Sequence, residues 1–256
     1  MIAWEEHGAG PVVLFVHGVG LDRSMWEQCL PSMASAGYRS VLVDLPGHGG
    51  SPPLSEEPTL ANMAAAVASV PFHPVHLVGF SIGAFIATEM TAAQPSRVRS
   101  LCLVSAVARR TEVERRTVLQ RLQQVTSDFE GTLDQTVDRW FSPEWSRREP
   151  EVRDRVRRLL LDNDPESYAA CYRLFALADA DAWDRLPAIP TPTLAVTGSD
   201  DLGSTPDMTF AIAEHMPRCR GVTVPDARHL LPLEQPGALM EAVTAHLDAA
   251  EQPPAL

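Results

Sequence analysis

The segment Val75-His76-Leu77-Val78-Gly79-Phe80-Ser81-Ile82-Gly83 decides the fold of this chain. Its first four residues form an apolar run typical of a buried strand, and the small and apolar residues of 82–93 predict a helix. Between strand and helix lies a G-x-S-x-G pattern centred on Ser81. A tight strand-to-helix turn leaves no room for bulky side chains beside the serine and raises it above the sheet edge. Ser81 is therefore the predicted nucleophile.

Short apolar runs alternate with helical patterns on both sides of this segment. Strands are predicted at 11–16, 40–44, 75–79, 98–104, 193–197 and 222–224. Helices are predicted at 24–36, 59–70, 82–93, 206–215 and 235–249, with Thr59 as the N-cap of the second. Continuous apolar strands separated by helices indicate a parallel sheet that is covered on both faces. The expected class is α/β, with a mostly parallel central sheet flanked by helices.

This alternation stops between residues 107 and 186. The stretch contains no strand-like run, its apolar residues follow helical spacing, and it holds most of the 21 basic residues, all of which are arginine. We expect a helical cap here, inserted into a core formed by residues 1–106 and 187–256. A cap at this point would form a lid over the carboxyl edge of the sheet. The alternative is a solvent-exposed helical insertion without a role.

An oxyanion hole is expected close to Ser81. Such a hole needs two N–H donors. The residue after the nucleophile, Ile82, would supply one, because it begins a helix whose first N–H groups are free. The loop His17-Gly18-Val19-Gly20, which directly follows the first long apolar run, would supply the other from Val19. The ring of His17 is expected to hold this loop rather than to react.

A serine hydroxyl needs an adjacent base to become a good nucleophile. Of the eight histidines, His229 lies just beyond the last predicted strand, so it should emerge at the same sheet edge as Ser81. The remaining histidines lie near the termini, at the wrong end of the Ser81 strand, in a turn or at a helix end. The pair His73-x-x-His76 lacks an acidic or cysteine partner, so no metal site is expected.

The acid that orients the base should follow the strand at 193–197. Gly198-Ser199-Asp200-Asp201 comes directly after it, and either aspartate could serve. We favour Asp201 and expect Asp200 to brace the loop. The resulting chain order of serine, aspartate and histidine is the order typical of a nucleophile elbow on an α/β sheet.

Composition excludes several other classes of protein. The chain has 256 residues and a net charge of −12, which disfavours nucleic acid as a partner. It contains no lysine, so no mechanism can use a catalytic lysine. The four cysteines show neither C-x-x-C nor zinc-ligand spacing.

The acidic N-terminus lacks the apolar core of a signal peptide, and no apolar run approaches the ~20 residues that span a bilayer. We therefore expect a cytoplasmic monomer or homodimer that acts on a small molecule and needs no cofactor, metal or membrane.

Four segments together resemble the α/β-hydrolase superfamily over essentially the whole chain. They are the His17–Gly20 loop, the turn Asp44-Leu45-Pro46-Gly47-His48-Gly49-Gly50-Ser51, the Ser81 elbow and the stretch 227–236. Members of the superfamily usually carry glycine before the catalytic histidine, whereas this chain has Arg228. They also place the acid three residues after the glycine, which favours Asp201, although the following stretch is one residue longer here.

Within the superfamily the chain is most similar to 3-oxoadipate enol-lactonases. Three cap segments carry this similarity: 139–144, 164–171 and 178–181. The resemblance implies cofactor-free cleavage of a carboxylic ester or enol-lactone through an acyl-enzyme. It also implies that Trp140 lines the acyl pocket and that a cap arginine, with Arg139 as the candidate, meets a substrate carboxylate. Trp140 could equally be part of the cap's own core.

Other activities of the same fold remain open. Serine at position 81 argues against haloalkane dehalogenases and epoxide hydrolases, which carry aspartate there. General carboxylesterases, carbon–carbon bond hydrolases, perhydrolases and acyltransferases all use the same three residue types. Some proteins of this fold keep the three residues but act as ligand receptors with very slow turnover.

Overall fold

Seven strands form a single sheet in the computed structural model, which describes residues 1–252. The spatial order of the strands is β1-β3-β2-β4-β5-β6-β7. Their bounds are β1 Trp4–His7, β2 Val12–Val16, β3 Arg39–Val43, β4 Val75–Phe80, β5 Val98–Val104, β6 Thr193–Gly198 and β7 Cys219–Val224. Only the pairing of β1 with β3 is antiparallel, and every other neighbouring pair is parallel. The predicted fold class, an α/β chain with a mostly parallel sheet, is confirmed.

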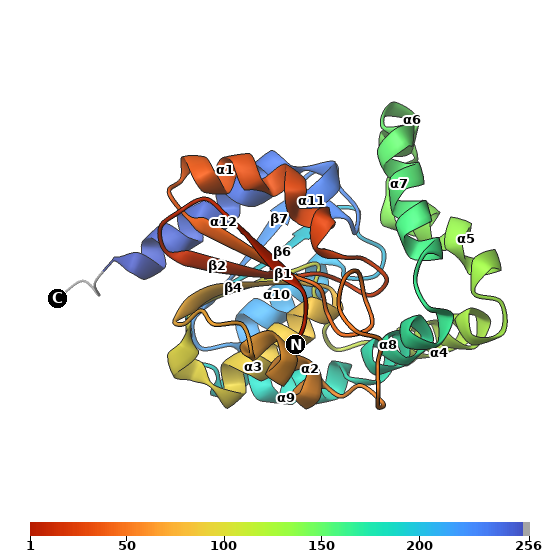
Figure 1. The fold of residues 1–256 in the computed structure, drawn as a ribbon, viewed down its shortest axis with the longest axis horizontal. Helices are drawn as coiled ribbons and strands as arrows, with labels where there is room; N and C mark the ends of the chain where they lie inside the picture. The colour runs from red at the N-terminus through yellow and green to blue at the C-terminus, as the bar shows by residue number, and fades with distance from the viewer. Residues whose placement is uncertain (253–256) are drawn as a thin grey trace.

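Helices cover both faces of this sheet, as Figure 1 shows. The helices α1 (Leu30–Ser35) and α12 (Pro236–Glu251) pack on one face, and α2 (Leu60–Ala68), α3 (Ile82–Ala93) and α10 (Pro206–His215) pack on the other. This double cover explains why β4 and β6 are buried along their whole length and consist largely of apolar residues. Within residues 1–252, none of the helices combines the length and the apolar character that crossing a membrane would require.

The N-terminal part of the sheet differs from the prediction. Strand β1 was not expected because its sequence, WEEH, is short, charged and mostly exposed. It forms because an antiparallel edge strand needs only one partner and can leave its side chains in water. The predicted helix 24–36 is divided into a 3-10 helix, η1 (Arg23–Cys29), and α1, whose second residue is Pro31. Proline fits the first turn of a helix but cannot sit in its interior.

Two further local predictions, the cap of α2 and the start of the last strand, have different outcomes. Thr59 caps α2, since its hydroxyl accepts from the N–H of Asn62 at 3.1 Å and the Asn62 side chain accepts from the N–H of Thr59 at 2.8 Å. Strand β7 begins at Cys219, before the predicted start at 222, and is only half-buried. An edge strand of this kind lacks the continuous apolar run on which the prediction depended.

Residues 107–186 contain helices and no strand within the described part of the chain. The helices are α4 Glu112–Ser127, α5 Leu133–Trp140, α6 Pro143–Arg148, α7 Pro150–Leu161, α8 Pro165–Leu177 and α9 Asp179–Arg185. Figure 1 shows α4 to α8 gathered at one side of the core, with α6 and α7 projecting from it, whereas α9 lies beneath the sheet and contacts α3. The division of the chain into core and cap stays a prediction.

The strand order brings distant segments to one edge of the sheet. Because β2, β4, β6 and β7 are mutually parallel, the loops that follow them leave at the same, carboxyl, edge. These loops carry the predicted oxyanion segment, Ser81, the two candidate aspartates and His229. Ligands of open α/β sheets bind at this edge.

Candidate active site

Ser81 occupies a sharp turn between β4 and α3. Its φ is 55° and its ψ is −117°, a left-handed backbone conformation that residues other than glycine rarely adopt. The Ser81 N–H donates to the carbonyl of Val104 on the neighbouring strand at 3.0 Å. A strained backbone persists only where the surrounding structure holds it, and such positions cluster at functional sites.

Glycine is required on both sides of this turn. A Cβ on Gly79 would collide with the carbonyl of Gly83, and a Cβ on Gly83 would lie 2.5 Å from the carbonyl oxygen of Val16 and 2.6 Å from that of His17. A Cβ atom cannot lie this close to a backbone carbonyl oxygen. The two glycines of the motif therefore let β4, α3 and the loop after β2 pack together around Ser81.

We expect Gly83→Ala to destabilise the fold, because the added methyl group has only backbone to displace. Inserting one methyl group into a packed site costs about 1–3 kcal/mol, which urea unfolding would measure. Gly237→Ala is the matched control, since a Cβ there meets nothing within 4 Å. A Gly83→Ala variant that is as stable as the wild type would contradict this account of the turn.

The structure joins His229 to Asp201. The Nδ1 of His229 lies 2.8 Å from the Oδ2 of Asp201. The other carboxylate oxygen accepts from the N–H groups of Gly203 at 2.8 Å and Ser204 at 2.9 Å. Burial alone would raise the pKa of Asp201, but the hydrogen bonds and the charge of His229 lower it. An ionised, fully bonded carboxylate is the partner that holds an imidazole in one tautomer.

Asp200, the other candidate, points elsewhere. It is exposed, and its carboxylate accepts from the hydroxyl of Ser199 at 3.1 Å. Its backbone N–H donates to the carbonyl of Ala227 at 2.9 Å. Of the two aspartates, only Asp201 reaches His229.

Several contacts that the sequence did not indicate fix the position of His229. The hydroxyl of Ser105 donates to the His229 carbonyl at 3.0 Å, and the His229 N–H donates to the carbonyl of Trp140 at 3.1 Å. The imidazole packs against the rings of Phe80 and Trp140, with centroid separations of 5.0 and 5.9 Å. Ser105 directly follows β5 and has a φ of 47°, but no sequence motif marks it.

The loop after β2 is held by His17. The Nε2 of His17 accepts from the N–H of Leu45 at 2.9 Å, so its Nδ1 carries the proton and donates to the carbonyl of Gly18 at 2.8 Å. Burial lowers the pKa of His17 to about 4, which keeps the ring neutral. This histidine therefore has both ring nitrogens engaged in holding the loop, as its predicted structural role requires.

Two backbone donors remain free beside Ser81. Val19 lines the same cavity as Ser81, and Ile82 is the first residue of α3. Among residues 1–252, neither of their N–H groups donates to another protein group. Backbone N–H groups at a helix start and in a neighbouring loop suit a developing negative charge.

The cavity over Ser81 is narrow, with a volume of about 50 Å³. Its walls are Val19, Phe80, Ser81, Arg121, Arg139, Trp140, Tyr172, Phe175, Asp201, Gly203, Ser204 and His229. Pockets for drug-sized ligands hold ~300–1,000 Å³, so side chains from the helices above Ser81 must move to admit a substrate of that size. Residues 107–186 supply five of these wall residues, including both Arg139 and Trp140.

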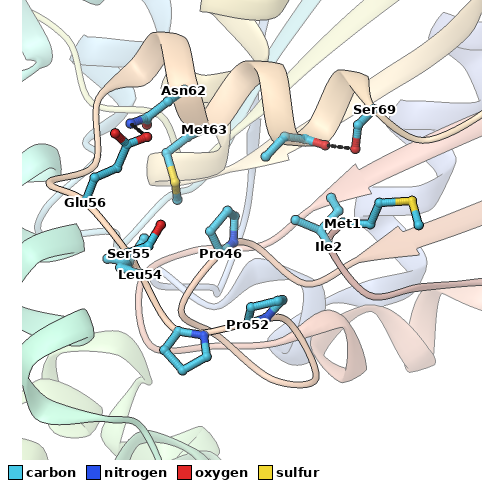
Figure 2. Close-up of a pocket in the computed structure, with 12 residues that line it drawn as sticks. Met1, Ile2, Pro46, Pro52, Leu54, Ser55, Glu56, Asn62, Met63 and Ser69 are labelled. Atoms are coloured by element: carbon cyan, nitrogen blue, oxygen red, sulfur yellow. Dashed lines mark hydrogen bonds between the residues drawn. The ribbon is translucent and has the colours of Figure 1, made fainter.

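A larger cavity, of about 410 Å³, lies elsewhere (Figure 2). It is formed by the first residues of the chain, the 46–56 loop and α2, and none of the predicted site residues line it. This cavity therefore lies apart from the predicted catalytic residues. Within the described residues no group of three or more His, Cys, Asp or Glu side chains could hold a metal ion.

Two arginines face the Ser81 cavity without an acidic partner. Arg121 lies on α4 and Arg139 at the end of α5, and neither forms an ion pair or side-chain hydrogen bond within residues 1–252. The only acid in the cavity wall, Asp201, is bonded to His229. Burial and the nearby charge of Arg121 both lower the pKa of Arg139. The negative charge in the cavity wall therefore lies on Asp201, which is bonded to His229, and neither arginine has a carboxylate partner among residues 1–252.

A parallel sheet with a strained serine after β4 and a hydrogen-bonded aspartate–histidine pair after β6 and β7 defines the class of α/β hydrolases. The family model for α/β hydrolases matches residues 13–242, so the chain belongs to this family.

Characterised relatives cover nearly the full chain. It is 30% identical to (E)-2-((N-methylformamido)methylene)succinate hydrolase of Acinetobacter baylyi, over 95% of this chain and 92% of the relative. It is 28% identical to 3-oxoadipate enol-lactonase 1 of the same species, over 88% and 84% of the two chains. A thermophilic esterase from Thermogutta terrifontis, solved with malate bound, superposes with a TM-score of 0.88 at 29% identity, covering 98% and 94% of the two chains. These three proteins are named as a hydrolase, an enol-lactonase and an esterase, and the enol-lactonase is of the kind that the sequence resembles.

Proposed function

We propose that the chain is a carboxylic ester hydrolase that cleaves an ester or enol-lactone through Ser81, His229 and Asp201. The observation that carries this proposal is the hydrogen bond between His229 and Asp201, formed in the same cavity as the strained Ser81. An acid bonded to a base, with both residues lining the cavity of a serine, suits acyl-transfer chemistry.

In the proposed reaction His229 removes the hydroxyl proton as the Ser81 oxygen bonds to the substrate carbonyl carbon. The N–H groups of Val19 and Ile82 then stabilise the oxyanion. When the intermediate collapses, the bond to the leaving oxygen breaks and that oxygen takes the proton from His229. Water, deprotonated by His229, attacks the acyl-enzyme, and the acid product leaves as Ser81 regains its proton.

The substrate proposed for this site carries a carboxylate besides its ester bond. Arg121 and Arg139 lie in the wall of the cavity without an acidic partner among the described residues, and an arginine fork suits a carboxylate. The names of two relatives contain succinate and 3-oxoadipate, and the related esterase was solved with malate bound, which supports an acidic substrate. In this proposal Trp140, whose ring packs against His229, forms the wall along the acyl chain.

A matched pair of substrates tests this proposal. Initial rates are measured with 3-oxoadipate enol-lactone and with its neutral methyl ester, and 4-nitrophenyl acetate reports ester cleavage in general. We expect kcat/KM for the free acid to exceed that for the methyl ester. Equal values would contradict carboxylate recognition, and the absence of turnover of all three compounds would contradict ester hydrolysis.

Removal of either arginine should weaken binding of the acidic substrate. A hydrogen bond to a charged group contributes enough to change KM by roughly 10- to 100-fold, so Arg139→Ala and Arg121→Ala should each raise KM for the free acid by that factor. Turnover of 4-nitrophenyl acetate should change little, since this ester carries no carboxylate. Arg158→Ala is the control, because Arg158 is an exposed cap arginine outside the cavity. An unchanged KM in both cavity variants would contradict the assignment.

A further inference from the structure

Arg228 joins the loop that carries His229 to the end of α5. Its guanidinium Nη1 donates to the carbonyls of Asp138 and Phe141, each at 3.1 Å. The next two N–H groups, of His229 and Leu230, both donate to the carbonyl of Trp140, at 3.1 and 3.2 Å. Three consecutive residues of the base-bearing loop therefore bond to the last turn of one cap helix.

Glu234 reinforces this junction from inside the protein. Its side chain is buried, and its two oxygens accept from different segments. One oxygen accepts from the N–H of Ser142, just beyond α5, at 3.0 Å, and the other accepts from the N–H of Arg228 at 2.7 Å. A single carboxylate thus bonds the cap segment and the base-bearing loop together.

The ends of helices explain why these bonds form. The last carbonyls of an α-helix have no partner within the helix, and a cation near them is favourable because the C-terminal end carries partial negative charge. At the end of α5 the carbonyls of Asp138, Trp140 and Phe141 all receive donors from the base-bearing loop. Arg139 and Trp140, which line the Ser81 cavity, lie within this tethered turn.

We propose that Arg228 and Glu234 are positioning residues that hold the Arg139–Trp140 turn and the His229 imidazole in one fixed geometry. A cavity of about 50 Å³ has to widen for a substrate of the usual ligand size. The proposed role of the tether is to keep the base aligned with Ser81 when other parts of the wall shift. This inference rests on the proposed function in one respect, that His229 activates Ser81.

A small phosphonofluoridate tests the alignment without involving the substrate-binding groups. The Ser81 oxygen bonds to phosphorus, the P–F bond breaks, fluoride leaves, and the hydroxyl proton passes to His229. The labelling rate therefore reports how well His229 activates Ser81. It is measured by intact mass against time, with the labelled residue identified by peptide mapping and the melting temperature recorded in parallel.

Arg228→Ala should be labelled about 10- to 100-fold more slowly than the wild type, because a small displacement of a catalytic group has effects of this size. Arg228→Lys, which retains a charged donor, should recover part of the rate. Arg158→Ala, which removes an exposed cap arginine, should be labelled at the wild-type rate. A purely stabilising role would lower the melting temperature and leave the labelling rate unchanged, and this result would overturn the inference.

Glu234→Gln provides a second variant should Arg228→Ala fail to fold. Its amide can accept only one of the two N–H groups and turns a donor toward the other, so labelling should again slow by at least tenfold. A wild-type rate in this variant would overturn the inference while the proposed function stands. A wild-type protein that is not labelled at Ser81 would overturn the proposed function, and the inference with it.

Discussion

Ser81→Ala should remove turnover of every ester and lactone substrate, with kcat falling by about 10⁴- to 10⁶-fold. The hydroxyl is the only atom group that the change removes, and the proposed covalent intermediate forms on its oxygen. The fold should persist, because Ser81 holds its turn through a backbone N–H that alanine retains. Initial rates with 4-nitrophenyl acetate and circular dichroism, measured on the same preparation, check both parts of this expectation.

Ser55→Ala is the matched control for this change. Ser55 is an exposed serine in the wall of the larger cavity of Figure 2 and lies outside the Ser81 cavity. Its replacement should leave the rate at the wild-type value. Substantial turnover by a correctly folded Ser81→Ala variant would show that the nucleophile is another residue or that the reaction needs none.

Asp201→Asn should lower kcat by about 10⁴-fold with little change in the fold. One oxygen of Asp201 accepts two backbone N–H groups, so the asparagine oxygen would take that place and its amide would face His229. The Nδ1 of His229 would then accept a hydrogen bond, and its proton would move to Nε2. An imidazole in that tautomer cannot take the proton of Ser81.

Asp200→Asn should leave kcat nearly unchanged, since the exposed Asp200 carboxylate bonds only to the neighbouring Ser199 hydroxyl. The two variants change the same functional group at adjacent positions, so they control for each other. A large loss in Asp200→Asn together with near wild-type activity in Asp201→Asn would exclude the site geometry described above.

Much of the fold could be predicted because parallel strands that are covered by helices on both faces are continuous apolar runs. The buried strands β2, β4, β5 and β6 are apolar runs between helical patterns, and their order along the chain matches the order of the predicted strands. Strand β1 was missed because its stability comes from pairing with β3 and not from apolar side chains. Helical propensity alone could not reveal the 3-10 segment η1, whose geometry depends on its cap and on Pro31.

The candidate site was predictable where a motif constrains the backbone. Gly79 and Gly83 mark the turn around Ser81, and His229 follows the last strand. The choice between Asp200 and Asp201 depended on the path of a single loop, and a shift of one residue reverses the direction of a side chain. The sequence favoured Asp201, and the structure brings this residue to His229.

Other site residues depend on contacts between segments that are far apart in the sequence. Ser105 and Arg121 belong to no motif, and their positions become evident only when β5 and α4 pack near Ser81 and His229. Glu234, at the end of α11 (Leu231–Glu234), lies in the stretch 227–236 that resembles the superfamily, but its bonds to Ser142 and Arg228 are seen only in the structure. Arg228 was visible as a departure from the family pattern. Its bonds to the end of α5 could not be inferred, because they join segments that are 87 and 90 residues apart in the sequence.

The central claim, acyl transfer through Ser81, is tested most directly by trapping the covalent intermediate. The wild-type protein is mixed with 4-nitrophenyl acetate, quenched in acid within milliseconds, digested and mapped by mass spectrometry. We expect a burst of nitrophenol and an acetyl group on the peptide that contains Ser81, with neither in Ser81→Ala. Nitrophenol release without a modified peptide, or an acetyl group on another residue, would contradict the claim.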